Sequence, residues 1–169
     1  MSAWHVSRKW PIVCGVAGAV IVLDRLTKTV VASHMELHQS IPVIESFVAL
    51  TYVRNPGVAF GLLAGRWLAF RVPLLLGVSG FAVTMLVWFL RGIAPRRHLL
   101  VAACGAVLGG AIGNMIDRVA FGEVIDFVDL SLGPYHWPAF NVADAAITLG
   151  VAVLCLDALR NPASSRALS

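Results

Sequence analysis

Charged residues are scarce in this sequence of 169 residues. Asp, Glu, Lys and Arg together make up 13% of the chain, whereas a soluble domain carries roughly 25%. Hydrophobic residues make up 59%. This composition argues against an ordinary soluble domain and indicates a membrane protein, and the length suits a single domain.

Cysteine is also rare, and its spacing does not suggest a site. All three cysteines, Cys14, Cys104 and Cys155, lie within apolar runs, which favours helix packing over a disulfide framework. The sequence shows no glycine-rich phosphate loop, no G-x-S-x-G motif and no zinc-ligand spacing. We therefore expect no metal and no cofactor.

The few basic residues form short clusters at the ends of apolar runs, and the net charge is +4. The clusters contain Arg8, Lys9, Arg91, Arg96, Arg97, Arg160 and Arg166. This distribution follows the positive-inside rule rather than forming a phosphate-binding face. We expect cytoplasmic N- and C-termini and no nucleic-acid partner.

Four apolar segments are each long enough to cross a hydrocarbon core of about 30 Å. They cover residues 10–32, 67–90, 99–119 and 138–159. We predict one membrane-embedded domain over residues 1–169, all-α apart from a small β element, with four transmembrane helices. A cleavable signal peptide is the alternative for the first segment, but "DRLTK" follows it instead of a small-residue cleavage site.

Residues 41–63 have a different pattern. The stretch "IPVIESFVALTYVRNPGVAFGLL" is rich in β-branched and aromatic residues, which predicts two short strands around a turn. Pro56 and Gly57 suit the central positions of a type II turn. We expect an extracytoplasmic β element on the membrane surface, between the first two helices.

Four carboxylates fall at or near the outer ends of the predicted spans: Asp24, Asp117, Asp126 and Asp144. A carboxylate inside a span is a functional hypothesis by default, because burying its charge in lipid is costly. Asp144 lies within the fourth predicted span and is the hardest to explain otherwise. For Asp24, an ion pair with Lys28 at the helix end is the simpler interpretation.

Asp126 and Asp144 are close enough in sequence to meet where the chain turns back into the membrane. Two adjacent carboxylates share one proton and titrate as a unit. The ionised member can activate water, and the protonated member can polarise a peptide carbonyl. This pair therefore favours aspartic-protease chemistry.

Five motifs occur in order along nearly the whole chain: "LDRLTK" (23–28), "RNPGVAFGLL" (54–63), "GGAIGNMIDR" (109–118), "VIDF" (124–127) and "FNVADAAITLG" (140–150). In this combination the sequence resembles lipoprotein signal peptidase, the type II signal peptidase of bacteria. Arg25 and Ala145 stand where the family commonly has glutamine and serine. Val58 and Met115 stand where alanine and leucine are common. None of these differences removes a carboxylate.

The resemblance implies a four-helix aspartyl protease of the bacterial inner membrane, with a β-cradle and its active site near the extracytoplasmic face. Such enzymes cleave diacylglyceryl-modified prolipoproteins before the lipidated cysteine. The resemblance identifies Asp126 and Asp144 as catalytic. It further implies substrate-binding roles for Asn55, Gly109, Asn114, Arg118 and Asn141, and we expect supporting roles for Asp24, Lys28 and Asp117. The expected partners are prolipoproteins and membrane lipid, and we expect a monomer.

Two other classes of protein predict different patterns. A small transporter or proton channel would place polar residues along the full depth of several spans, but the inner halves of the second and fourth spans are almost purely apolar. A structural subunit would tolerate Asp126→Asn and Asp144→Asn.

Overall fold

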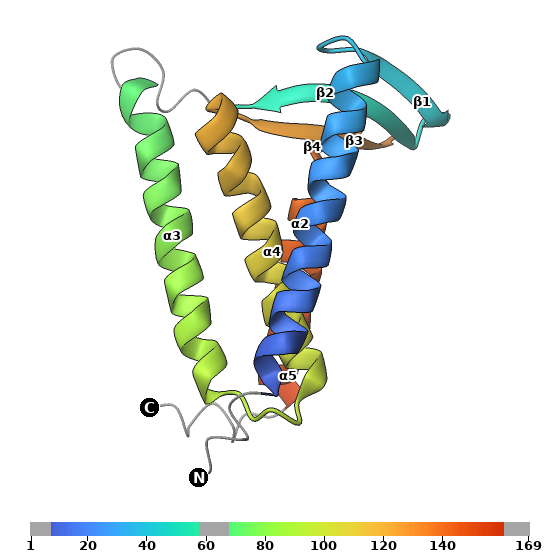
Figure 1. Cartoon of the computed structure of the whole chain (residues 1–169). Helices are drawn as coiled ribbons and strands as arrows, with labels where there is room; N and C mark the ends of the chain where they lie inside the picture. The colour runs from blue at the N-terminus through green and yellow to red at the C-terminus, as the bar shows by residue number, and fades with distance from the viewer. Residues whose placement is uncertain (1–7, 58–67, 161–169) are drawn as a thin grey trace.

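The long helices run side by side, with a small sheet at one end of them (Figure 1). The computed structural model describes residues 8–57 and 68–160. The helices are α2 (Lys9–His34), α3 (Leu68–Gly92), α4 (His98–Phe121) and α5 (Val142–Arg160). All four are long and apolar enough to span a membrane, which confirms the predicted number of transmembrane helices.

The first three helices agree with the predicted spans to within a few residues, although residue 67 lies outside the described part. The fourth prediction was wrong at its start. Helix α5 begins at Val142, because the preceding residues up to Phe140 belong to a strand. The apolar run "PAF" resembled the beginning of a span but continues a sheet.

The sheet contains four antiparallel strands in the order β1-β2-β3-β4. Their bounds are β1 (Ser40–Ile44), β2 (Val48–Asn55), β3 (Val124–Leu132) and β4 (Tyr135–Phe140). The prediction included only the first hairpin and placed its turn at Pro56 and Gly57, whereas the chain turns between Ile44 and Val48. Gly57 does have a positive φ of 77°, and residues 58–63 of the predicted element lie outside the described part.

The sheet is anchored on α2 by a small apolar core. Val31 of α2 and Met35, which follows the helix, pack with Tyr52 of β2 and with Ile125 and Phe127 of β3. These side chains are almost fully buried. The contact holds β3, which carries Asp126, against the end of α2.

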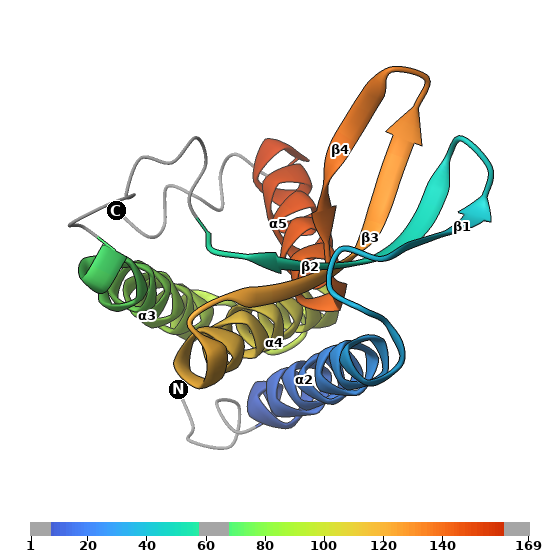
Figure 2. The same ribbon diagram turned by 90° about the horizontal axis from the view of Figure 1, so that it is seen from above.

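Helix α4 lies in the middle of the bundle and contacts each of the other three helices (Figure 2). Its glycines allow close approach on two sides. A Cβ on Gly109 would lie 2.7 Å from the Ala17 carbonyl oxygen, and a Cβ on Gly110 would clash with the carbonyl oxygen of Ala143. This is the small-residue packing expected of membrane helices.

Lys9 ties the start of α2 to the end of α3, far from the sheet. Its Nζ donates to the carbonyl oxygens of Leu90 at 2.7 Å, Arg91 at 2.9 Å and Ile93 at 3.0 Å. Three acceptors match the three protons of an ammonium group. The Arg91 carbonyl lies in the last turn of α3, where a helix leaves carbonyl oxygens without intrahelical partners.

Gly110→Ala should destabilise the fold by about 1–3 kcal/mol, because the added methyl forces α4 and α5 apart. Gly80→Ala is the matched control, since a Cβ there meets nothing within 4 Å and alanine favours the helix. Thermal unfolding in detergent measures both variants. Equal unfolding temperatures for the two would contradict the packing described for α4 and α5.

Candidate active site

Asp126 and Asp144 lie where the sheet meets the helices. Asp126 is on β3 and its residue is only 2% exposed. Asp144 is half-buried in the first turn of α5. A strand and a helix start therefore present one carboxylate each at the same end of the bundle.

Asn141 and Asp144 form a reciprocal cap at the start of α5. The Asn141 Oδ1 accepts a hydrogen bond from the Asp144 backbone N–H at 2.9 Å. In return, Asp144 Oδ2 accepts one from the Asn141 N–H at 3.3 Å. This arrangement is a capping box with an amide as the cap, which explains why an amide and a carboxylate stand one turn apart.

Asn141 also reaches the second aspartate. Its Nδ2 donates to Asp126 Oδ1 at 2.7 Å. Asn55 Nδ2 donates to Asp126 Oδ2 at 2.8 Å, and Asn114 Nδ2 donates to Asp144 Oδ1 at 2.7 Å. Each carboxylate thus contacts two asparagines, and Asn141 links the pair.

Strand pairing brings Asn55 to its position. Asn55 pairs with Val124 and Val53 with Asp126 in the antiparallel β2–β3 ladder. Asn55 and Asp126 are therefore diagonal neighbours, a separation that a polar side chain can bridge. The β2 strand supplies this contact although it lies 71 residues earlier in the chain.

The environment of Asp126 changes its ionisation. Burial raises the pKa of the Asp126 carboxyl to about 6, although the hydrogen bond from Asn55 lowers this pKa. The nearby Asp144 raises this pKa further, whereas the Asn141 hydrogen bond and the charge of Lys28 lower it. A carboxyl with this pKa exchanges a proton near neutral pH, as general acid–base catalysis requires.

A second group of charges lies directly behind the aspartates. Lys28 Nζ lies 2.8 Å from Asp24 Oδ2 and 2.8 Å from Asp117 Oδ2. The expected Asp24–Lys28 pair is confirmed. Asp117 also pairs with Arg25, a contact that sequence spacing did not reveal because the two residues lie on different helices.

Arg118 and Gly109 occupy different surroundings. Arg118 Nη1 donates to the Asn114 carbonyl oxygen at 3.3 Å, and its guanidinium lies beside Gly57, in the turn after Asn55. Gly109 instead faces Ala17 of α2, a position that favours helix packing. Substrate contact by Gly109 stays a prediction.

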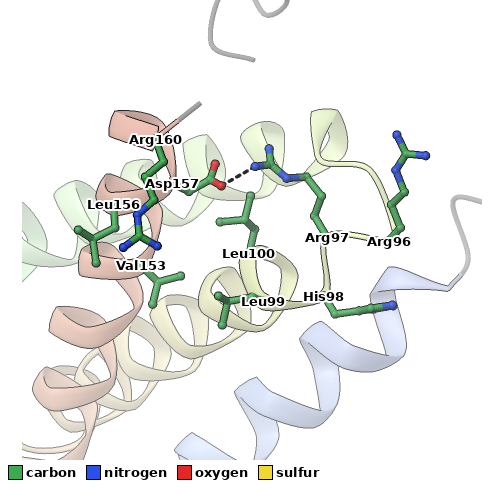
Figure 3. Close-up of a pocket in the computed structure, with 9 residues that line it drawn as sticks. All are labelled: Arg96, Arg97, His98, Leu99, Leu100, Val153, Leu156, Asp157 and Arg160. Atoms are coloured by element: carbon green, nitrogen blue, oxygen red, sulfur yellow. Dashed lines mark hydrogen bonds and ion pairs between the residues drawn. The ribbon is translucent and has the colours of Figure 1, made fainter. Parts of the chain in front are cut away.

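A pocket of about 470 Å³ lies at the other end of α4 and α5 (Figure 3). Its lining contains Arg96, Arg97, His98, Leu99, Leu100, Val153, Leu156, Asp157 and Arg160. The lining holds a single carboxylate, Asp157, which is 2.5 Å from Arg97. This pocket therefore offers no pair of carboxylates for acid–base chemistry.

Residues 8–57 and 68–160 contain no group of three or more His, Cys, Asp or Glu side chains arranged to hold a metal ion. The acid–base groups at the boundary of sheet and helices are the two aspartates, surrounded by amide donors and one guanidinium. Such an arrangement can activate water and stabilise charge on a substrate carbonyl.

Comparison with known proteins identifies the family. The family model described as signal peptidase (SPase) II matches residues 16–160. The chain belongs to the signal peptidase II family. It is therefore a peptidase, and its four membrane-length helices make it a multi-pass membrane protein. The family assignment favours the peptidase over the transporter and structural-subunit alternatives.

Individual relatives cover most of the chain. It is 48% identical over 144 residues to a lipoprotein signal peptidase of Syntrophus aciditrophicus, covering 85% of this chain and 89% of that protein. It is also 48% identical over 146 residues to one of Syntrophotalea carbinolica, covering 86% and 89%. A bacterial membrane enzyme solved by the in meso method at 1.9 Å shares 32% identity and a TM-score of 0.79, covering 88% of this chain and 93% of that one.

Substitutions of Asn141 should separate its two contacts. Asn141→Ala should lower stability by about 1 kcal/mol through loss of the helix cap, and it should also lower peptidase activity. Asn141→Ser keeps a capping oxygen but cannot donate to Asp126 as the longer amide does. We expect the serine variant to regain thermal stability in detergent without regaining activity; full activity in that variant would refute the linking role of Asn141.

Proposed function

We propose that this peptidase removes the signal peptide from diacylglyceryl-modified prolipoproteins by cleaving before the lipidated cysteine. The substrate class is supported by the relatives, which are named lipoprotein signal peptidases. The chemistry is supported chiefly by one observation: Asn141 donates to both carboxylates, from its Nδ2 to Asp126 and from its backbone N–H to Asp144. Two carboxylates joined in this way suit an aspartic dyad that activates water.

In the proposed reaction the dyad begins with one proton, held by Asp126. Asp144 removes a proton from water, whose oxygen forms a bond to the scissile carbonyl carbon. Asp126 donates a hydrogen bond to the carbonyl oxygen and then gives its proton to the leaving amide nitrogen as the C–N bond breaks. Transfer of the new proton from Asp144 to Asp126 restores the starting state.

The surrounding polar groups would hold the substrate backbone. Asn114 and Asn141 lie beside the dyad and offer amide groups to an extended peptide. The Arg118 guanidinium interacts electrostatically with both aspartates and would hold a substrate carbonyl or an acidic group. Asn55 would act through Asp126, which it touches, and through the adjacent turn.

The charges at one end of the bundle support the proposed membrane orientation. Arg91, Arg96, Arg97 and Arg160 all lie at the helix ends away from the sheet. By the positive-inside rule this end faces the cytoplasm. The sheet and the dyad then lie at the extracytoplasmic face of the bacterial inner membrane, where a lipidated substrate is anchored, and one chain contains the whole site.

Asp126→Asn and Asp144→Asn should each lower kcat by about 100-fold or more, because general acid–base catalysis supplies at least that much. The assay uses purified enzyme in detergent, a diacylglyceryl-modified prolipoprotein and EDTA. Asp129→Asn is the matched control, since Asp129 is on the same strand but contacts His136 instead. Cleavage that survives both dyad substitutions would exclude the proposed mechanism.

The pH profile should report the shared proton. Because Asp126 has a pKa of about 6 and must be protonated, kcat/KM should fall as pH rises through that value. Bound substrate excludes water and so adds to the burial that raises this pKa. The alkaline limb of the kcat profile should therefore lie at higher pH than that of kcat/KM.

Asn55→Ala tests whether the Asp126 pKa sets the alkaline limb of kcat/KM. The Asn55 hydrogen bond lowers the Asp126 pKa, so its loss should move the alkaline limb of kcat/KM upward. A limb that moves downward would show that another group loses the proton.

A further inference from the structure

Lys28 is the centre of the charges behind the dyad. Its residue is fully buried on α2. The ammonium lies 2.8 Å from Asp24, 2.8 Å from Asp117 and 3.1 Å from Asn114 Oδ1. The Asn114 contact is a hydrogen bond donated by the ammonium, and the two carboxylates form ion pairs with it. Among the described residues no hydrogen bond or ion pair joins Lys28 directly to either dyad aspartate.

Each carboxylate bound by Lys28 holds the backbone just before one dyad residue. Asp24 Oδ1 accepts a hydrogen bond at 3.0 Å from the N–H of Ala143, which precedes Asp144. Asp117 Oδ2 accepts one at 3.3 Å from the N–H of Ile125, which precedes Asp126. Lys28 therefore joins two carboxylates whose other contacts are the two backbone segments that carry the dyad.

The third partner of Lys28 controls a side chain. An ammonium cannot accept a hydrogen bond, so the Asn114 atom that faces it must be the oxygen. Asn141 Nδ2, at 3.2 Å, also needs an acceptor there. The Asn114 Nδ2 is then directed away from both donors and toward Asp144 Oδ1, 2.7 Å away. A flipped amide would place its oxygen against the carboxylate instead.

We infer that Lys28 is a positioning residue for the reaction, which sets the separation and orientation of Asp126 and Asp144 by holding Asp24, Asp117 and Asn114 together. The inference rests on the proposed dyad and adds a role for the charges behind it. Hydrogen bonds to charged groups are among the stronger ones in proteins. A buried charge network of this kind therefore holds a rigid geometry.

The central test is the double variant Asp24→Asn/Lys28→Met. The asparagine keeps an oxygen for the Ala143 N–H, and removing both charges leaves neither an unpaired ammonium nor an extra carboxylate. Arg25 still pairs with Asp117. We expect KM within about threefold of wild type and kcat lowered about 100-fold, since a displacement of about 1 Å costs that much.

A pH profile supplies a readout that a purely structural role would not change. The charge of Lys28 lowers the pKa of Asp126, so its removal should shift the alkaline limb of kcat/KM to higher pH. The other charged groups that act on Asp126 are Asp144 of α5 and Arg118 of α4. Both remain in the double variant. Loss of the Asp24 carboxylate would by itself lower the Asp126 pKa, so a shift of the limb to higher pH reports the loss of the Lys28 charge.

The matched control is Arg97→Gln/Asp157→Asn, which removes an ion pair at the opposite end of α4 and α5 (Figure 3). We expect wild-type kcat and an unchanged limb in this control. Wild-type kcat with an unshifted limb in Asp24→Asn/Lys28→Met would overturn the inference. Reduced thermal stability with unchanged kcat of the folded enzyme would overturn it equally.

Asp117→Asn tests the positioning role of Lys28 if the double variant does not fold. It keeps an oxygen for the Ile125 N–H but breaks the ion pair between Lys28 and Asp117. We expect kcat to fall about tenfold with KM unchanged, and full activity would refute the inference. Asp126→Asn is assayed in parallel: its activity would refute the dyad itself, whereas its inactivity beside a fully active positioning variant would refute the role of Lys28 alone.

Discussion

A charge inside a membrane protein needs an opposite charge or a hydrogen-bond partner within reach, and this requirement organises the sheet-side end of the molecule. Asp24, Lys28 and Asp117 are all fully buried, at a depth where an uncompensated charge is costly. Their partners come from different elements: α2, α4, β3 and the start of α5. Neutralising the charges therefore also fixes these elements relative to one another.

Asparagine suits the layer between this charge network and the dyad. An amide offers a donor and an acceptor in one rigid plane, so a contact on its oxygen directs its nitrogen. Asn114 accepts a hydrogen bond from Lys28 on its oxygen and donates one to Asp144 from its nitrogen. Asn141 caps α5 and donates to Asp126. Neutral side chains can thus orient two carboxylates without adding further charge beside them.

The membrane helices and the family could be predicted from the sequence, because long apolar runs and ordered motifs are local signals. Strands β3 and β4 could not, since Asp126 and Asp129 interrupt the apolar pattern of β3 and "PAF" continues into an apolar helix. The Asp24–Lys28 pair follows from helical spacing. The contacts of Asp117 with Lys28 and Arg25 cross from α4 to α2, and spacing along one helix carries no information about such pairs.

The Asp24–Lys28 pair also bears on the biosynthesis of the chain. Lys28 is made 86 residues before its partner Asn114, so α2 can enter the bilayer before α4 has been synthesised. At that stage an isolated ammonium would oppose insertion, but Asp24 lies one turn away on the same helix and can neutralise it. The first helix can thus remain in lipid before the other helices arrive, because its two opposite charges pair with each other. The later arrival of α4 and α5 then converts a pair that served insertion into the base of a reaction site.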